Sequence, residues 1–552
     1  MGTTNSKPTT TQPATQAEKY ASIQSSSTIA HRNDVCCDTQ IGSSRDGGAY
    51  ASDRLHRIAA ETSFNTQSHQ SARLGQGHSV VPDHDTSHAE VTISALKAWD
   101  SAALHAPVTQ LATMTLHNGP IKDNLRNRKA ETEDLHVFSH KIPSQGTPVT
   151  NQQSSGRCWL FATTNVVRLQ VIKQLNLKDF ELSQSYLAFW DKLEKSNTFL
   201  ENSIELADKA LDDRVFGFLK TAPTNDGGQW DMVTNLIKKY GIVPKVIYPE
   251  SYNSSNSSQI NWLLTLKLRE YALELRQLKK STISALLRVG QTDAHANEAK
   301  ALRVVRERKD AQMAEVYRMM IIALGVPPQP DQTFTFEYYD KDDKFNRLKA
   351  TPLEFLDKYT GSFDPAGACS LVNDPRRPYD KLVTVDRLQN VWGGQPVLYV
   401  NTSTSQMKDS VIKSIKAGLP VFFGCDVGQF SNGGIMDPDV YDFELPFGIK
   451  LGLTKAERIE MGESSMTHAM VITGVHLDED NKPVRYRVEN SWGPDRGDKG
   501  YMVMSDKWFD EFVYQVVIRK QHMPSHLWKL FTDGVNEQTE VLPPYDPMGA
   551  LA

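Results

Sequence analysis

The sequence has few cysteines and no long apolar run. Its 552 residues contain five cysteines, a small and odd number that argues against a disulfide scaffold and favours a reducing compartment. No apolar stretch approaches the roughly 18–20 residues that span a bilayer, and the first thirty residues lack the apolar segment of a secretory signal. The cysteines show no metal-ligand spacing. We therefore expect a cytoplasmic protein with no membrane span, no metal and no cofactor.

The sequence also lacks a strong excess of either charge. Sixty-one basic and 66 acidic residues give a formal net charge of −5, which provides no general attraction to nucleic acid or to anionic membranes. One basic stretch, from Lys300 to Lys309, leaves a nucleic-acid-binding or scaffold role open. The acids that interrupt and follow it, Glu307 and Asp310, and its helical spacing favour a solvated helix face instead.

Residues 1–90 are rich in Ser, Thr, Gln and His and poor in large apolar residues. Such a segment buries too little apolar surface to offset its chain entropy, so we predict a disordered polar extension. Its first six residues match the myristoylation pattern M-G-x-x-x-S, although Ser and Thr are abundant here. A weak N-terminal lipid anchor and a mitochondrial pool therefore stay open beside the cytoplasm.

The rest of the chain changes from helical to strand-like patterning. Helical spacing runs over 94–104, 110–118 and 158–177 and then almost throughout 261–324, whereas strand-like apolar runs occur at 397–400, 420–423, 469–475 and 486–488. We predict an α+β fold with a helical half, a helical insertion and a β-rich half, followed by a C-terminal arm. The expected boundaries are 91–260, 261–330, 331–540 and 541–552.

Cys158 stands at the predicted start of a helix, two residues after Gly156. The reactive form of cysteine is the thiolate, and the aligned peptide dipoles at a helix N-terminus lower the pKa of a thiol there. Glycine leaves room for a substrate backbone to approach. A lone cysteine in a helix is usually only a small apolar residue. This position instead favours a catalytic nucleophile.

His468 opens an apolar strand, and Asn490 follows another strand 22 residues later. The polar turn between the two strands allows a hairpin that places Asn490 beside His468. Asn490 would then orient the imidazole and leave its second nitrogen for Cys158. His476 lies further along the same strand and is the competing histidine, but we expect it at a solvated strand end.

The motifs Gln-Gln-Ser-Ser-Gly-Arg-Cys-Trp-Leu-Phe-Ala and Asn-Ser-Trp-Gly resemble those of papain-like cysteine peptidases, in the version of the bleomycin hydrolase family. The resemblance covers residues 91–552. It implies a papain-like fold and a cysteine aminopeptidase that works through a thiol acyl-enzyme, with bleomycin-like amides as incidental substrates. Gln152 is the implied oxyanion donor, together with the Cys158 N–H. The implied substrate-binding residues are Gly227, Gly228, Trp492, which would also shield the His–Asn hydrogen bond, and Ala552.

Cys158 and His468 are 310 residues apart, whereas roughly 130–150 residues are typical of papain-like peptidases, so the helical block is the expected insertion. The proline-rich end from Leu542 predicts an extended arm. By resemblance, this arm lies in the enzyme's own cleft, where the carboxylate of Ala552 attracts the free amine of a peptide substrate. The resemblance also implies a homohexamer. Should the arm not dock, the alternative is a papain-like endopeptidase.

Overall fold

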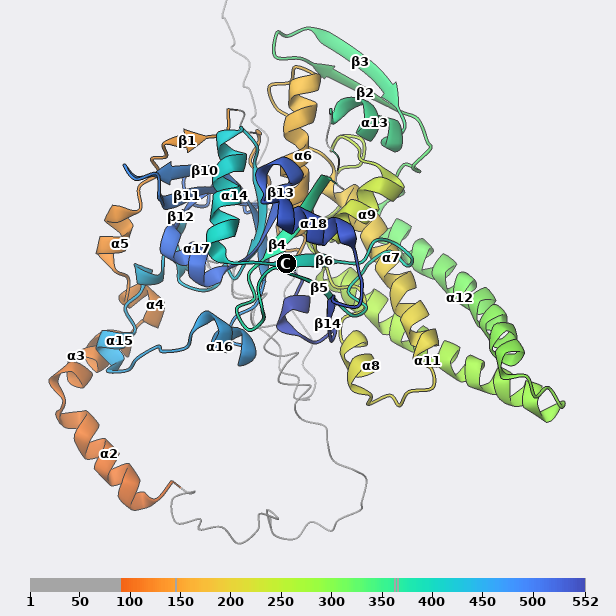
Figure 1. The fold of residues 1–552 in the computed structure, drawn as a ribbon, viewed down its shortest axis with the longest axis horizontal. Coiled ribbons are helices and arrows are strands. Elements are labelled where there is room, and N and C mark those ends of the chain that lie inside the picture. The colour runs from red at the N-terminus through yellow and green to blue at the C-terminus, as the bar shows by residue number, and fades with distance from the viewer. Residues whose placement is uncertain (1–90, 144–145, 362–363, 365–366, 552) are drawn as a thin grey trace, which may run out of the picture. The chain divides into compact units, whose positions relative to one another are not determined.

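The computed structural model describes residues 91–143, 146–361, 364 and 367–551. The predicted disordered extension 1–90 and the predicted substrate-binding residue Ala552 lie outside these ranges. The described residues form a mixed helical and sheet structure, which confirms the α+β prediction (Figure 1). Within these ranges, no helix combines the length and apolarity needed to cross a membrane.

The helices of the described part fall into three groups. Those before the insertion are α2 (Ile93–His105), α3 (Pro107–Leu116), α4 (Ile121–Asn124), α5 (Arg128–Glu133), α6 (Cys158–Gln174), α7 (Gln184–Glu205), α8 (Arg214–Leu219), α9 (Trp230–Tyr240) and α10 (Tyr252–Ser255). The insertion holds α11 (Ser258–Arg288) and α12 (Ala294–Leu324). After it come α13 (Pro352–Tyr359), α14 (Thr404–Lys416), α15 (Glu444–Phe447), α16 (Lys455–Glu460), α17 (Asp506–Phe512) and α18 (Ser525–Asp533).

The strands lie mostly after the insertion. They are β1 (His140–Lys141), β2 (Phe334–Tyr339), β3 (Phe345–Ala350), β4 (Ala368–Val372), β5 (Lys381–Val385), β6 (Leu398–Asn401), β7 (Val421–Cys425), β8 (Ser431–Asn432), β9 (Ile435–Met436), β10 (His468–Leu477), β11 (Pro483–Glu489), β12 (Tyr501–Ser505), β13 (Val513–Arg519) and β14 (Glu540–Leu542). Strands β6, β7, β10 and β11 match the four strand-like runs expected from the sequence. Among the described residues, twelve strands form one sheet in the order β14-β5-β6-β4-β13-β7-β10-β11-β12-β9-β8, with β1 added at β10.

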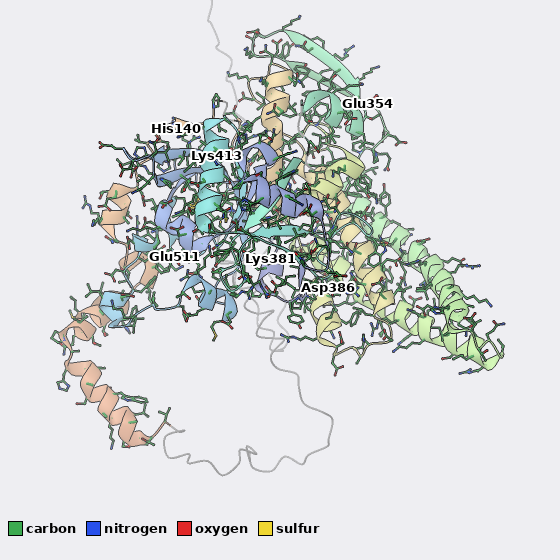
Figure 2. All side chains as sticks on the ribbon, viewed as in Figure 1. His140, Glu354, Lys381, Asp386, Lys413 and Glu511 are labelled. Atoms are coloured by element: carbon green, nitrogen blue, oxygen red, sulfur yellow. The ribbon has the colours of Figure 1, made fainter. Side chains whose placement is uncertain are left out.

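Both faces of the central strands are buried. Phe422 packs into a core shared with the helical half, whereas its neighbour Phe423 packs into a second core with α14, α17 and α18. The same alternation separates Val471 from Ile472 on β10. Because successive side chains of a strand point to opposite faces, a sheet covered on both sides reads as continuous apolar runs. Charged side chains such as Lys381 and Lys413 lie on the outside (Figure 2).

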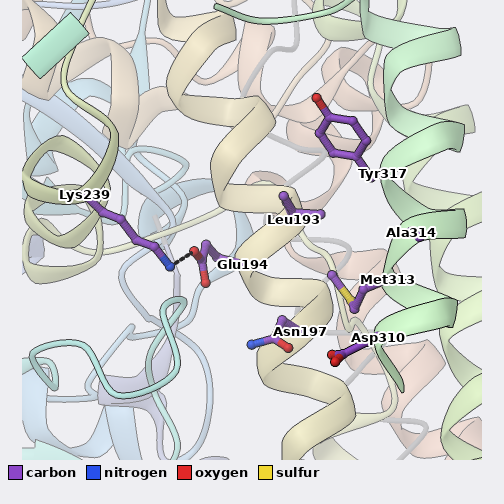
Figure 3. Close-up of a pocket in the computed structure, with 8 residues that line it drawn as sticks. All are labelled: Leu193, Glu194, Asn197, Lys239, Asp310, Met313, Ala314 and Tyr317. Carbon is purple, nitrogen blue, oxygen red and sulfur yellow. Dashed lines mark hydrogen bonds and ion pairs between the residues drawn. The ribbon is translucent and has the colours of Figure 1, made fainter. Parts of the chain in front are cut away.

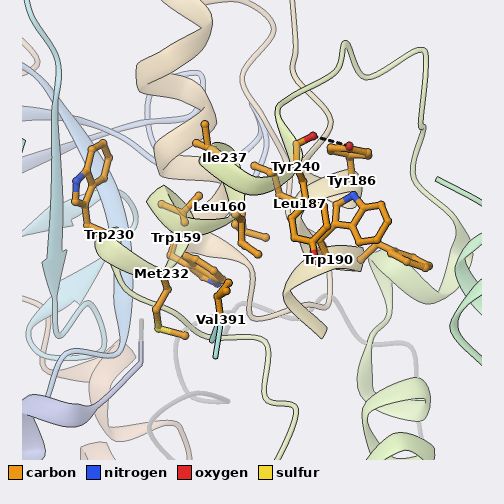
Figure 4. Close-up of a cluster of buried hydrophobic side chains, with 14 of the residues drawn as sticks. Trp159, Leu160, Tyr186, Leu187, Trp190, Trp230, Met232, Ile237, Tyr240 and Val391 are labelled. Atoms are coloured by element: carbon orange, nitrogen blue, oxygen red, sulfur yellow. Dashed lines mark hydrogen bonds between the residues drawn. The ribbon is translucent and has the colours of Figure 1, made fainter. Parts of the chain in front are cut away.

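Aromatic side chains fill the core of the helical half. Trp190 stacks on Tyr240 with ring centroids 4.2 Å apart, and the Tyr186 hydroxyl donates to the Tyr240 carbonyl at 2.8 Å (Figure 4). Trp159 of α6 is fully buried in the same core. This packing joins α6, α7 and α9, so it holds the start of α6 in place beside the sheet.

The insertion differs from the expected near-continuous helix. It contains two helices, separated at residues 289–293, where Gly290 has φ +80° and the Asp293 side chain accepts the Ala296 N–H. A positive φ and an N-cap residue end one helix and start the next. Both helices pack on each other and on α7. Arg306 and Lys309 of α12 form ion pairs with Glu201 of α7. Part of the basic stretch is therefore occupied by internal ion pairs.

Strands β2 and β3 form a separate hairpin and pack on the helical half, although they follow the insertion in sequence. Phe334 and Phe336 of β2 and Phe355 of α13 are buried in the core of the helical half. Helix α13 contacts α6 and α9. The chain therefore returns to the helical half before it enters the large sheet at β4.

Candidate active site

Cys158 is the first residue of α6 and is 2% exposed. Two contacts, one from Gly156 and one from Arg157, hold the turn that precedes Cys158. Gly156 donates its N–H to the carboxylate of Asp226 at 3.2 Å, and the buried Arg157 forms an ion pair with Glu250 at 3.0 Å. A side chain at position 156 would place its Cβ 3.1 Å from the Asp226 side chain, so this close approach favours glycine. The structure thus places Cys158 at a helix N-terminus, as the sequence predicts.

His468 and Asn490 are brought together by the β10–β11 hairpin. Nε2 of His468 lies 2.9 Å from Oδ1 of Asn490, and both side chains are buried. The Ser491 N–H donates to the same Oδ1 at 2.8 Å, and the Asn490 amide nitrogen donates to the Met502 sulfur at 3.2 Å. Oδ1 is therefore an acceptor, so Nε2 of His468 carries the proton and leaves the other nitrogen as a base.

The indole of Trp492 packs against the His468 ring, and its shielding of the His468–Asn490 bond stays a prediction. The Trp492 and His468 rings lie 4.9 Å apart at an angle of 31°. On the sulfur side, the backbone N–H of Ala469, the residue after His468, acts to lower the pKa of the Cys158 thiol. His476 lies eight residues from His468, where it pairs with Arg485 on β11. At about 3.3 Å per residue, His476 is about 26 Å along the strand from His468.

Burial disfavours both a lone thiolate at Cys158 and a lone imidazolium at His468. It raises the pKa of the Cys158 thiol to about 11, while backbone N–H groups of Ala469, Trp159 and Cys158 act in the opposite direction. It lowers the pKa of His468 to about 4, which the hydrogen bond to Asn490 only partly offsets. Proton transfer from Cys158 to His468 would create both charges together, as an ion pair. The helix N-terminus and Asn490 are placed to stabilise that pair.

Gln152 lies against the residue that follows Asn490. Its N–H donates to the Ser491 carbonyl at 2.8 Å, and its Oε1 accepts the Ser491 hydroxyl at 2.6 Å. Its Nε2 donates one hydrogen to the Ser155 carbonyl at 2.6 Å. An amide nitrogen carries two hydrogens, so one remains for a substrate oxygen. Ser491 was not among the predicted site residues, although it lies inside the Asn-Ser-Trp-Gly motif.

The two predicted substrate-binding glycines lie beside Trp159 and Lys195. A Cβ at Gly228 would lie 2.4 Å from the Trp159 ring, so packing already requires glycine there. The Gly227 carbonyl accepts a hydrogen bond from Lys195 at 2.5 Å. Both glycines are buried. Their contact with substrate main chain therefore stays a prediction.

Asp226 is a site residue that the sequence reasoning missed. Its buried carboxylate accepts hydrogen bonds from Lys192, Ser257 and Asn261 as well as from Gly156. Burial alone would raise the pKa of Asp226, but Lys192 and the hydrogen bonds hold it well below its usual range. Since Ser257 and Asn261 lie at the start of α11, the base of the insertion is joined to the turn before Cys158.

The C-terminal arm is held at several points. Asp546 forms ion pairs with Arg376 at 2.8 Å and Arg377 at 3.3 Å, and Met548 is buried in the core of the helical half. The Ala550 carbonyl accepts a hydrogen bond from Gln229 at 2.7 Å. Gln229 directly follows the glycine pair. The arm therefore reaches the Gly227–Gly228 segment two residues before the predicted Ala552, which lies outside the described range.

A different part of the helical half carries a surface hollow of about 460 Å³. It lies between α7, α9 and α12, where Glu194 binds Lys239 and Tyr317 forms part of the wall (Figure 3). None of the predicted site residues lines it. Among the described residues, no group of three or more His, Cys, Asp or Glu side chains is arranged to hold a metal ion.

A buried cysteine at a helix start, next to a strand pair that joins histidine to asparagine, is the arrangement of papain-like cysteine peptidases. Fold and site together define that class. A family model described as the Peptidase C1-like family matches residues 90–549, and the chain belongs to this family.

Known proteins of this family are similar to the chain over most of its length. The mitochondrial cysteine proteinase 1 of Saccharomyces cerevisiae is 43% identical over 470 residues, which are 84% of this chain and 93% of the yeast protein. Bleomycin hydrolase of Mus musculus is 44% identical over 429 residues, 76% of this chain and 89% of the mouse protein. The crystal structure of PepW from Lactobacillus rhamnosis superposes with a TM-score of 0.77 at 42% identity, and covers 84% of this chain and 100% of that one.

These similarities confirm the predicted resemblance, fold and enzyme class. The chain is a cysteine peptidase, and the comparisons support a cysteine aminopeptidase of this family. They favour neither the endopeptidase nor the nucleic-acid-binding alternative.

Proposed function

We propose that Cys158, His468, Asn490 and Gln152 hydrolyse the N-terminal peptide or amide bond of a substrate through a thiol acyl-enzyme. The 2.9 Å contact between His468 and Asn490 is the observation that carries this proposal, because it fixes which imidazole nitrogen is free to accept a proton. The effect of the Ala469 N–H, which acts to lower the pKa of the Cys158 thiol, supports it, because Ala469 directly follows His468.

In the proposed first step, His468 takes the thiol proton and the Cys158 sulfur attacks the scissile carbonyl. The negative oxygen of the tetrahedral intermediate accepts hydrogen bonds from the free Gln152 amide hydrogen and from the Cys158 N–H. His468 then gives its proton to the leaving amine, and the acyl-enzyme remains. A water molecule that loses its proton to His468 attacks this thioester, and the thiol returns with release of the acid.

This chemistry is tested with fluorogenic amides of single amino acids. We expect the Cys158→Ala variant to lose all measurable hydrolysis and alkylation by iodoacetamide at this site, since both need the sulfur. The Cys369→Ala variant provides a matched control, because Cys369 is also a buried free cysteine. Full activity in the Cys158→Ala variant would refute the proposal.

The arm supplies the proposed selectivity for a free N-terminus. Its contacts at Asp546, Met548 and Ala550 support docking beside the glycine pair, where it would occupy room that a longer substrate needs. Deletion of Leu551 and Ala552 should raise hydrolysis of N-acetylated amides relative to the same amides with a free amine. An unchanged ratio would remove the arm from the specificity mechanism.

The proposed assembly is a homohexamer, with the number of subunits taken from the family resemblance. Its support is the exposed apolar surface of α2 and α3, which bury no side chain within the described part of the chain. Trp99 is 58% exposed and Met114 is 76% exposed. Large exposed apolar patches commonly mark interfaces. Sedimentation should show a smaller particle for a Trp99→Glu, Met114→Glu double variant, and a wild-type monomer would contradict the assembly.

The proposed location is the cytoplasm. Cys158, Cys369 and Cys425 are free thiols, which fits a reducing compartment. Cell fractionation with an antibody against the chain tests this, and a signal confined to mitochondria or membranes would contradict it.

A further inference from the structure

The side chain of Gln229 joins three segments of the active-site region. It is fully buried, and its Nε2 donates to the Ala550 carbonyl at 2.7 Å. The Met466 sulfur lies 3.8 Å from the same nitrogen. Gln229 follows the glycine pair, and Met466 precedes His468 by two residues. The amide of Gln229, a residue that directly follows the glycine pair, therefore contacts both the loop before His468 and the arm.

The arm has an anchor on its other side. Asp546 is paired with Arg376 and Arg377, and both arginines are also paired with Asp374. Between Asp546 and Ala550 the chain forms a short 3-10 turn, η5 (Pro547–Gly549), in which Met548 is buried. The ion pairs hold the base of the arm, whereas the bond from Gln229 is the last hydrogen bond before the end of the described chain.

The bond from Gln229 to Ala550 limits how far the end of the arm can extend. With the Ala550 carbonyl held, the two residues that follow it extend at most about 7 Å. Without that bond the arm is held at Met548 and by the packing of the half-buried Leu551; where Leu551 also comes loose, the four residues after Met548 extend about 14 Å. The volume open to the end of the arm grows with the cube of this reach, so it becomes about eight times larger and the local concentration of the end falls by the same factor.

We propose that Gln229 is a specificity-determining residue, which fixes the end of the arm at the depth that admits a single substrate residue before the scissile bond. This inference rests on the proposed function of the arm. A buried glutamine that served only core packing would need no bond to the arm. Here Nε2 makes that bond, and Oε1 has no hydrogen-bond partner within the described residues.

The test is the Gln229→Met variant, because methionine preserves length and volume but donates no hydrogen bond. The measured quantity is the ratio of kcat/KM for an amino-acid fluorogenic amide with a free amine to that for its N-acetylated form. We expect this ratio to fall more than twofold and up to about eightfold, the factor by which the local concentration of the end falls, mainly through faster hydrolysis of the N-acetylated form.

Gln312 offers a matched control on α12. It too is fully buried, its Nε2 donates a hydrogen bond to Glu274 at 3.0 Å, and its Oε1 has no hydrogen-bond partner among the described residues. The Gln312→Met variant should leave the ratio unchanged. Should Gln229→Met not fold, Gln229→Asn keeps the amide but withdraws it by one methylene, and it should lower the ratio as well.

A second comparison uses the chain that lacks Leu551 and Ala552. In that background Gln229→Met should change the ratio less than twofold, because the end that it positions is gone. An equal effect in both backgrounds would overturn the proposal. If truncation lowers the ratio but Gln229→Met does not, Gln229 has no role in specificity and the proposed function of the arm stands. If truncation does not change the ratio, both the role of Gln229 and the proposed function of the arm are refuted.

Discussion

The hydroxyl of Ser491 should contribute to catalysis through Gln152. It donates to the Gln152 Oε1 at 2.6 Å, and both side chains are buried. Replacement of Ser491 by alanine leaves that acceptor in a dry site without its donor. The amide would then have to turn toward another donor, which moves its nitrogen away from the proposed oxyanion position.

The size of the effect follows from two limits. Loss of a whole oxyanion donor costs about 2.7–4 kcal/mol of barrier, or about 10²–10³ in kcat. Loss of one neutral hydrogen bond costs about 0.5–1.5 kcal/mol. Because Ser491→Ala leaves the donor in place but misaligned, we expect a loss near the upper value of the second range. That corresponds to about a tenfold fall in kcat at 1.4 kcal/mol per factor of ten, with little change in KM.

Steady-state hydrolysis of a fluorogenic amide measures both constants. The control is Ser203→Ala, since Ser203 is buried and donates only to Phe199 of its own helix, and it should leave kcat unchanged. In a Gln152→Ala background, Ser491→Ala should cost less than a further twofold. Additive losses in the double variant, or a Ser491→Ala enzyme with wild-type kcat, would refute the reasoning.

Two further predictions concern stability. Burial lowers the pKa of Lys455 to about 7, so between pH 7 and about 10 the unfolded chain binds the proton that the folded chain lacks. The free energy of unfolding should therefore rise with pH across that window, by up to about 1.4 kcal/mol per pH unit from this lysine, and this gain is lost as the pH falls toward 7. Urea titrations at several pH values should show a flatter pH profile for Lys455→Met. Gly228→Ala should destabilise the protein by about 1–3 kcal/mol, because its Cβ would lie 2.4 Å from the Trp159 ring. Gly217→Ala, which meets no atom within 4 Å, should not lower the melting temperature, and equal melting temperatures for the two variants would contradict the packing argument.

Local patterning predicted most of the fold. The helix at Cys158, the strand at His468 and the hairpin that carries Asn490 are confirmed, because each depends on apolar spacing within one element and on turn residues between neighbours. The break in the insertion was missed. Gly290 and Asp293 are helix-ending and helix-starting residues, but the helical patterning on both sides concealed them.

Site residues that lie inside a short sequence motif were predicted. Contacts between residues far apart in the sequence were missed. The Ser491–Gln152 bond joins residues 339 positions apart, and the Gln229–Ala550 bond joins residues 321 positions apart. Asp226 has no signal in the sequence beyond its place before two glycines. Its role depends on Lys192 of α7 and on Ser257 and Asn261 at the start of α11.

The sequence by itself predicted the proposed chemistry: which side chains are the candidates for nucleophile, base and orienting amide, in which order, and on which kinds of element. The tertiary structure decided the pairings: which hydroxyl holds Gln152, which amide meets the arm, and which charges surround the turn before Cys158. Periodicity records whether a side chain faces the interior, but it carries no information about the partner found there. That partner is set only when the helical half, the sheet and the arm pack together.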